Sequence, residues 1–333
     1  MRPLELAPNL LRRFYRGGPR IAAFRGLASS RDDTPEDWVG STTSASRSGD
    51  VGLSRVDGRL LKGLVEAEPE AFLGPDHVEE RGADPAILVK LLDAGQRLPV
   101  HLHPDDDFAR ARLGERYGKT EAWMILAADA GASVHVGFAR DVGEDELRAL
   151  VAAQDVDAIM ALMNERPVAA GDAIYVPAGL AHVIGGGILL LEIQEPSDLG
   201  LLLEWRGRVP EDDAFLGLPP GDALRCVTRT ALDDAALERL TSMRERRYFP
   251  DEADAFFRAD RLSGGSELEP SFSILVIVDG EGALETEHAD PVPVRRGSTW
   301  LVPHAAGTAR LGGACAAIAC RPSAPARRSD RRP

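Results

Sequence analysis

Two histidines lie one residue apart in the stretch LPVHLHPDDD, where a single leucine separates His101 from His103. In a β-strand, residues i and i+2 point to the same face, so both imidazoles would face the same space. Imidazole nitrogens bind transition metals such as Zn²⁺ and Fe²⁺. The pair therefore predicts either a metal site or two structural histidines, and by itself it leaves both interpretations open.

A third histidine, His182, follows the segment GDAIYVPAGLA. By itself such a histidine is more typical of a structural residue than of a metal ligand. On the next predicted strand, Glu192 and Gln194 alternate onto one face, where they could line the interior or pair with its rim. The remaining histidines stand in no comparable context and are predicted to be structural or surface residues: His77, His135, His288 and His304.

Lysine is rare in this chain, and only three of its 39 basic residues are lysine. They are Lys62, Lys90 and Lys119, and the last two flank the histidine pair. Lysine and arginine differ in geometry and in how readily the side chain gives up a proton, which suggests that a retained lysine is kept for its amine. Lys90 and Lys119 are therefore candidate functional residues.

Short apolar segments separated by turn residues surround these side chains and predict β-strands. They are AILVKLLDAG at 86–95, AWMILAA at 122–128 and SVHVGFA at 133–139. Residues 144–165 differ, since their apolar side chains recur at helical spacing and predict one or two helices broken near Asp155.

Two later segments share a pattern of glycine, a strand, Val-Pro, a small turn and another strand: GDAIYVPAGLAHVI and GSTWLVPHAAGTARL. The repeat predicts a mainly β protein made of two related antiparallel β-barrel-like domains. The expected domains are 1–205, which includes the helical segment at about 144–165, and 206–325, followed by a disordered tail at 326–333. The second segment has Gly307, not histidine, in its turn region, so no metal is expected in the second domain.

The composition limits the classes of partner and the location. The 333 residues carry a formal net charge of −14, which argues against nucleic acid and anionic membranes as partners. No apolar segment approaches the length that spans a bilayer, and the N-terminus lacks the apolar core of a secretion signal. The three cysteines form no CxxC pair and are too few for a disulfide framework, so a cytoplasmic location is expected.

The spacing of glycine and histidine resembles the two sequence motifs of the cupin superfamily. Gly95 is followed by five residues and His-Leu-His, and Gly171 by five residues, Pro-Ala-Gly, two residues and His182. This resemblance implies antiparallel barrels of the jelly-roll kind, with a metal at the mouth of one, held by three histidines and a glutamate. The nearest strand-borne glutamate is Glu121, which starts an apolar strand, where an unpaired carboxylate would be costly and a metal would remove that cost.

The insertion between the histidine pair and this glutamate narrows the resemblance. The segment HPDDDFARARLGERYGKTEAWMIL resembles type I phosphomannose isomerases, whose signature has His-Pro-Asp and then Gly-Lys-Thr-Glu. YRGGPRIAAFRG, EDWVGS and RPVAAGDAIYVPAGLAHVIGGGILLLEIQEPSD also resemble segments of that family. The resemblance covers most of 10–205 and, loosely, the C-terminal block, and it is nearer to the compact bacterial form than to the longer eukaryotic one.

Carried over residue by residue, the resemblance implies that the metal is zinc. Its ligands would be His101, His103, Glu121 and His182. His101 stands where the family usually has glutamine, and a site with three histidines and one glutamate could favour Fe²⁺ or Mn²⁺ instead.

The same resemblance implies the interconversion of mannose 6-phosphate and fructose 6-phosphate. This reaction moves a proton between C1 and C2 through an enediol(ate), and the metal would stabilise the developing charge. Lys90 and Lys119 match lysines of the family's substrate site, one near the sugar phosphate and one near the metal, and would be the catalytic residues. The expected partner is a small-molecule sugar phosphate, and the oligomeric state is not predicted.

One departure from the family pattern keeps two other functions open. The family commonly has an arginine four residues after Asp198, where this chain has Leu202, although Arg206 or Arg208 could reach the site from elsewhere. This loss is consistent with a non-catalytic sugar-phosphate-binding paralogue. A second alternative is another metal cupin enzyme such as a dioxygenase, which His101 favours and the Gly-Lys-Thr-Glu insertion disfavours.

Other residues of these motifs are predicted to have structural roles. The three aspartates at 105–107 are expected to form a solvated acidic turn, and Ser197 and Asp198 to form a turn. Trp38 and Trp123 are expected in the core or in a pocket wall.

Overall fold

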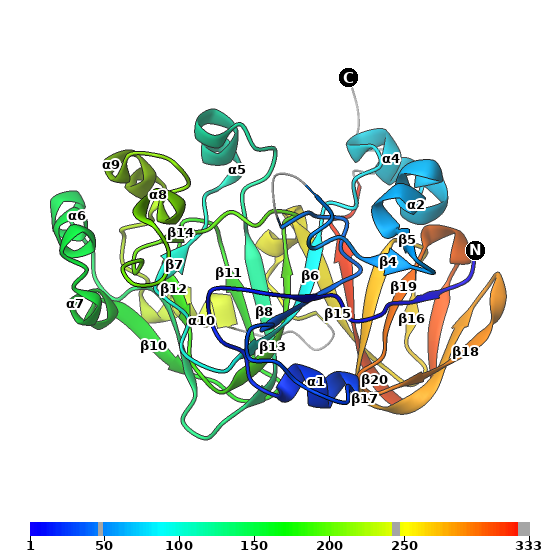
Figure 1. The fold of residues 1–333 in the computed structure, drawn as a ribbon. Coiled ribbons are helices and arrows are strands. Elements are labelled where there is room, and N and C mark those ends of the chain that lie inside the picture. Colours follow the sequence, from blue (N-terminus) through cyan, green and yellow to red (C-terminus); the bar gives the residue numbers. More distant parts are fainter. Residues whose placement is uncertain (46–48, 242–246, 326–333) are drawn as a thin grey trace.

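The computed structural model describes residues 1–45, 49–241 and 247–325, and the predicted disordered tail at 326–333 lies outside them. The fold is mainly β, and its three large sheets are antiparallel, as the sequence predicts (Figure 1). A central sheet is covered on one face by an outer sheet and on the other by the C-terminal sheet.

The central sheet carries much of the candidate site. Its strands, in spatial order, are β11 (Ala173–Val176), β8 (Glu121–Ala128), β13 (Ile188–Gln194), β6 (Leu88–Ala94), β3 (Glu36–Val39) and β2 (Leu10–Leu11). Every residue of β6 and β13 is buried. Strands covered on both faces need apolar side chains at successive positions, which explains why these segments are mostly apolar; the exceptions are Lys90, Asp93, Glu192 and Gln194.

The outer sheet carries the histidines. Its strands, in spatial order, are β10 (Met163–Pro167), β9 (Ser133–Phe138), β12 (His182–Ile184), β7 (His101–Leu102) and β14 (Leu201–Leu202). Side chains such as Leu92 and Ile125 of the central sheet pack against Val134 and Val136 of the outer sheet. The alternate side chains, such as Leu91 and Met124, pack on the C-terminal sheet. This two-sided burial fixes the register of the central strands, because a slip by one residue would exchange the two faces.

The C-terminal sheet includes a strand from the N-terminus. Its path is β1 (Leu4–Glu5), β19 (Thr299–Val302), β17 (Ser273–Thr286), β20 (Ala309–Pro322) and β15 (Phe257–Ser263), with β16 (Glu267–Leu268) beside β20 and β18 (Ala289–Arg295) beside β17. A small hairpin of β4 (Arg55–Val56) and β5 (Arg59–Leu60) stands apart. Among the described residues no sheet closes into a barrel, so the strand pairing does not confirm the prediction of two barrel-like domains. The C-terminal sheet ends at β1, β15, β16 and β18. It buries one face against the central sheet and encloses on the other an apolar cluster of its own strands.

Short helices connect and cover the sheets. They are α1 (Arg20–Arg25), α2 (Leu61–Ala67), α3 (Pro69–Leu73), α4 (Pro75–Arg81), α5 (Asp106–Phe108), α6 (Glu144–Ala153), α7 (Val156–Ala161), α8 (Glu211–Ala214), α9 (Pro220–Ala223) and α10 (Asp234–Thr241). A π-helical turn spans Ala109–Leu113, and 3₁₀ turns span Leu224–Cys226, Asp251–Ala255 and His304–Ala306. Among the described residues no helix is both long and apolar enough to cross a membrane.

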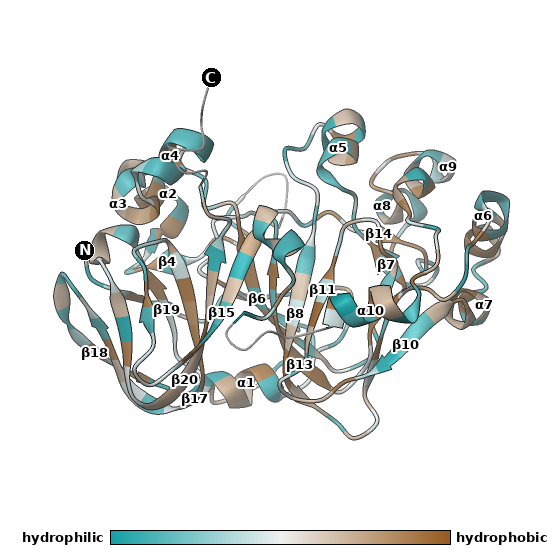
Figure 2. Cartoon of the chain, turned by 180° about the vertical axis from the view of Figure 1, so that it is seen from behind, coloured by the Kyte–Doolittle hydropathy of each residue, from teal (hydrophilic) through white to brown (hydrophobic). Residues whose placement is uncertain are grey.

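The predicted helical segment is observed as α6 and α7, which cover the outer sheet (Figure 1). The break lies at Asp155, whose side chain accepts a hydrogen bond from the backbone N–H of Ala158 at 3.1 Å and so caps α7. The prediction extended the helix too far, because Met163 already pairs with Phe138 as part of β10. Figure 2 shows hydrophobic residues concentrated along the strands, whereas the peripheral helices carry more hydrophilic residues.

Candidate metal centre

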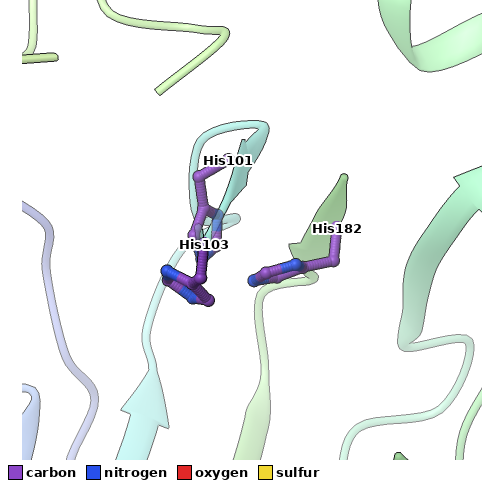
Figure 3. Close-up of side chains that lie close together, drawn as sticks. All are labelled: His101, His103 and His182. Carbon is purple, nitrogen blue, oxygen red and sulfur yellow. The ribbon is translucent and has the colours of Figure 1, made fainter. Parts of the chain in front are cut away.

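Two neighbouring strands of the outer sheet bring three histidines together. His101 on β7 pairs directly with His182 on β12, and His103 follows β7 two residues after His101. The backbone N–H of Gly179, which has a positive φ of 87°, donates to the carbonyl of His103 at 2.7 Å and ties the turn before β12 to the histidine pair. One potential ligand atom from each imidazole lies within 4.8 Å of the others (Figure 3). The predicted common face of the histidine pair is confirmed.

Backbone carbonyls fix the orientation of all three imidazoles. The Nδ1 atoms lie 2.8 Å from Pro99 O for His101, 2.7 Å from Leu199 O for His103 and 2.8 Å from Leu180 O for His182. A carbonyl oxygen can only accept, so each Nδ1 carries the proton and each Nε2 offers its lone pair. This second contact, which sets tautomer and ring orientation, is typical of metal-binding histidines.

The carboxylate of Glu121, at the start of β8, lies between two of these rings. Its Oε2 is 3.1 Å from Nε2 of His103, its Oε1 is 3.3 Å from Nε2 of His182, and Trp123 Nε1 donates to Oε1 at 2.9 Å. Nε2 of His182 is buried without a hydrogen-bond partner, and Oε2 of Glu121 has none apart from its ion pair with Lys119. Buried polar atoms without partners are costly, and a cation between them would satisfy both. Three imidazoles and one carboxylate fit a divalent transition metal.

Burial keeps the three imidazoles neutral at neutral pH. It lowers the pKa of His103 and of His182 to about 3, and that of His101 well below its usual value. The burial of Glu121 acts to raise its pKa, but the nearby Lys119 and His103 outweigh it and hold that pKa well below its usual range. The site therefore presents lone pairs and one negative charge, which is the protonation state that binds a metal.

Both candidate lysines lie beside this cluster. Lys119 Nζ is 2.7 Å from Glu121 Oε2 and 2.9 Å from His103 Nε2. Lys90 Nζ is 3.2 Å from Glu192 Oε1, and Lys119 Nζ is 3.8 Å from the same oxygen. All of these side chains are buried. The sequence left open whether Glu192 lines the interior or pairs with its rim. In the structure it lies in the interior, between the two lysines.

A pocket opens at the histidines, with an empty volume of about 560 Å³ that includes space open to solvent. Four of the residues that line it were missed as site residues by the sequence reasoning: Arg13, Tyr15, Glu36 and Asp198. Tyr15 and Glu36 lie in segments that resemble the phosphomannose isomerases, so the signal was present, but no role could be assigned to them from spacing.

The missed residues form a second polar network. Arg13 donates two hydrogen bonds to the Asp198 carboxylate at 2.9 and 3.0 Å, and its Nε lies 3.3 Å from Glu36 Oε1. Glu36 also accepts from the Tyr15 hydroxyl and, at 2.7 Å, from Trp38 Nε1. Asp198 is therefore a pocket residue and not only a turn former. Trp38 and Trp123 are fully buried as predicted, and each donates to a carboxylate of the site.

The position that lacks arginine faces the pocket. Leu202 on β14 pairs with His101 and lines the pocket. Neither suggested replacement reaches it, since Arg208 pairs with Glu204 and Arg206 is exposed and donates to backbone carbonyls of 152–153. The guanidinium that lines this pocket therefore comes from the N-terminal segment, from Arg13.

The other histidines stay apart from this site. Within the described ranges, the group of His101, His103 and His182 is the one set of three side chains placed to hold a metal. His77 is buried, and its ring hydrogen-bonds to the carbonyl of Asp84 at 2.7 Å, in keeping with a structural role.

Comparison with known proteins gives one consistent name. No protein-family model matches the chain. It is 36% identical over 200 residues to the mannose-6-phosphate isomerase of Streptococcus mutans, a match that covers 59% of this chain and 58% of the relative. It is 27% identical over 322 residues to the mannose-6-phosphate isomerase ManA of Bacillus subtilis, covering 93% of this chain and 96% of the relative.

Solved structures agree with these relatives. A mannose 6-phosphate isomerase structure from Bacillus subtilis superimposes with a TM-score of 0.77 at 24% identity, covering 96% of this chain and all of that one. A second neighbour, with a TM-score of 0.71 at 15% identity over 97% of this chain and all of its own, is a mannose 6-phosphate isomerase bound with zinc and yttrium. The comparisons confirm the resemblance to the type I phosphomannose isomerase family, whose fold this chain shares.

Proposed function

We propose that this chain is a metal-dependent aldose–ketose isomerase that interconverts mannose 6-phosphate and fructose 6-phosphate through an enediol(ate). The observation that carries the proposal is the cluster of three imidazoles beside a pocket, with a buried, ionised carboxylate 3.1 and 3.3 Å from Nε2 of two of them. The names of the relatives supply the reaction and the sugar.

The proposed metal is zinc, held by His101, His103, Glu121 and His182. A neighbouring isomerase structure contains zinc, which supports this choice. Fe²⁺ or Mn²⁺ is the alternative, because three imidazoles and a carboxylate also suit those ions. When bound, the metal would polarise the sugar oxygens and stabilise negative charge on the enediolate.

The proposed catalytic groups of the chain are Lys119 and Lys90. Aldose–ketose exchange moves one proton between C1 and C2 and another between their oxygens, so a group that carries protons must stand beside the ligand set. Lys119 Nζ fits this role, because it contacts both Glu121 and His103. Lys90, further along the pocket and held by Glu192, would bind the polar end of the sugar. Both amines are buried, which excludes bulk water from the proton transfer.

Further parts of the proposal rest on the sequence and the family resemblance. We infer two jelly-roll domains of the cupin kind, at 1–205 and 206–325, with the metal in the first. A sugar phosphate is the expected small-molecule partner, and the cytoplasmic location and the exclusion of nucleic acid and membrane remain predictions.

A second candidate function is a non-catalytic sugar-phosphate-binding paralogue. The observation that favours it is the charge pairing in the pocket, where each lining cation already contacts a carboxylate: Arg13 contacts Asp198, Lys90 contacts Glu192, and Lys119 contacts Glu121. With Leu202 in the wall, a phosphate dianion must compete with these carboxylates for its donors. A dioxygenase remains a third candidate, supported by His101 in the ligand set.

One experiment separates these candidates. The purified protein is stripped of metal, reloaded in turn with zinc, manganese, cobalt or iron, and assayed for fructose 6-phosphate formed from mannose 6-phosphate. Metal-restored turnover is expected for the isomerase, with oxygen consumption absent. Folded, metal-loaded protein that binds mannose 6-phosphate without turnover would replace the proposal with the binding paralogue, and iron-dependent oxygen uptake would replace it with a dioxygenase.

A further inference from the structure

The segment that carries Lys119 is fixed by side chains distant in sequence. Its three successive backbone N–H groups, from Gly118 to Thr120, all donate outside any sheet ladder. Gly118 donates to Asp106 Oδ1 at 2.7 Å, and Thr120 donates to Glu195 Oε2 at 2.7 Å. Lys119 itself donates to the carbonyl of Pro104 at 2.9 Å. Two carboxyl groups therefore hold the amides on either side of Lys119.

The carbonyls of the same segment are fixed as well. The Ser197 hydroxyl donates to Gly118 O at 2.6 Å, and the backbone N–H of Glu195 donates to Thr120 O at 3.1 Å. A Cβ at position 118 would lie 2.5 Å from Pro104 O and 2.6 Å from Asp106 N, so only glycine allows this approach. The acidic turn at 105–107 and the residues that follow β13 thus form hydrogen bonds to the segment 118–120 from two sides.

The carboxyl of Glu195 is unusual in having no cationic partner among the described residues, although it is only 4% exposed. Asp106, in contrast, pairs with Arg110 at 3.1 Å. Burial, opposed by the hydrogen bond from Thr120 and reinforced by the negative charge of Asp106, raises the pKa of Glu195 to about 8. At neutral pH Glu195 therefore keeps a proton that it can donate to the Asp106 carboxylate, so the two groups act as one hydrogen-bonded unit.

We propose that Asp106 and Glu195 are positioning residues that set the place of Lys119 beside Glu121 and His103. Neither side chain is a predicted metal ligand, and neither lines the pocket. Lys119 can work only where its Nζ reaches the ligand set, and a long lysine side chain has many rotamers, so its backbone must be held. Misplacement of a catalytic group by about 1 Å can cost on the order of 100-fold in rate.

The proposal rests on the proposed isomerase function. Kinetic measurements on alanine and amide variants test it. E195A and D106A are expected to lower kcat about 10- to 100-fold with KM for mannose 6-phosphate and the bound metal unchanged. E195Q is expected to keep near-normal kcat, because the amide oxygen still accepts from Thr120 and the amide N–H still donates to Asp106. The matched control is D107A, since Asp107 pairs with Arg110 as Asp106 does but is 95% exposed, whereas Asp106 also holds the Gly118 amide.

A second readout does not depend on activity. The chain has only three lysines, so selective ¹⁵N-lysine labelling gives three backbone amide signals in an NMR spectrum. In E195A and D106A the Lys119 signal is expected to shift and to exchange faster with solvent, while the Lys62 and Lys90 signals stay unchanged and report an intact fold.

The outcomes are distinct. An unchanged Lys119 signal with unchanged kcat in D106A and E195A would overturn the positioning role. Loss of all three native signals in E195A would indicate that this variant is unfolded. The positioning role is then tested by D106A, because Asp106 is partly exposed. A wild-type protein without isomerase activity would overturn the proposed function, and the Lys119 signal would still decide whether the carboxyl pair holds this segment.

Discussion

Two stretches of the chain share a glycine, a four-residue strand, Val-Pro and a turn, yet within the described residues only the first leads to a histidine placed to hold a metal. In the first, β11 leads through a turn with Gly179 at φ 87° to His182 on β12. In the second, β19 leads through a turn with Gly307 at φ 78° to Ala309 at the start of β20. The backbone pattern recurs while the chemistry does not.

The difference lies in what surrounds each turn. Around the first, the central sheet contributes Glu121 and the neighbouring strand contributes His101, so donors from three strands converge. Around the second, the enclosed face of the C-terminal sheet is filled by apolar side chains such as Leu275, Ile277 and Leu311. Glycine and proline therefore specify the turn, whereas the side chains that meet at its end specify whether a metal can bind.

Removal of one histidine is expected to have the largest effect on the difference in metal binding between the two turns. H182A is expected to lower metal affinity well beyond the roughly 10- to 100-fold that loss of an outer-shell partner costs, and to abolish turnover. The counterpart H304A, from the second turn, should keep both. Metal content after dialysis and turnover of mannose 6-phosphate measure the effect, and equal metal loss in the two variants would contradict the assignment.

The buried charges of the site provide the next comparison. K90M leaves Glu192 without its 3.2 Å partner in a fully buried place, and breaking such a pair costs about 3–5 kcal/mol. R321M breaks the ion pair with Asp260 in the C-terminal sheet, where both side chains are 11% exposed, and should cost less. Urea unfolding gives both free energies. An equal cost would mean that the site network is no more sensitive than an ordinary ion pair.

Trp123 on β8, the strand that pairs with β11, and Trp300 on β19 separate support of the metal site from core packing. W123F removes the N–H donated to Glu121 and should weaken metal binding about 10- to 100-fold. W300F removes the N–H donated to Ser298 at 3.1 Å and should leave metal affinity unchanged. Competition titration with a chelator measures both constants, and a shift of the same size in W300F would refute the supporting role of Trp123.

The last comparison concerns the pH dependence of the metal-free protein. His103 and His182 titrate near 6.5 when unfolded, but burial lowers the pKa of each to about 3 in the folded protein. Between these values the unfolded chain binds more protons, so stability falls as pH drops below 6.5. Each histidine contributes up to about 1.4 kcal/mol per pH unit. Urea unfolding of stripped protein at pH 7 and pH 5 checks this, and H182A should show a shallower slope.

The sequence was informative wherever the structural cause is local. The two-residue spacing of His101 and His103 fixes a common face, and apolar periodicity marks the buried strands β6, β8 and β13. The same periodicity found the helices around Asp155 but missed that β10 begins at Met163, because strand pairing with β9 outweighs helical spacing there. The mainly β, antiparallel character was also predicted correctly, whereas the strand pairing of the described residues closes no sheet into a barrel.

What the sequence determined by itself is the set of candidate ligands and the strands that carry them, because both follow from short motifs and from their resemblance to a known family. Tertiary structure alone decided the rest of the pocket. Arg13 meets Asp198 across 185 positions of sequence, and Glu192 meets Lys90 only because β13 and β6 are neighbours in the central sheet. Charged side chains pair when they lie a few ångströms apart in space, and the order of residues along the chain does not give these distances.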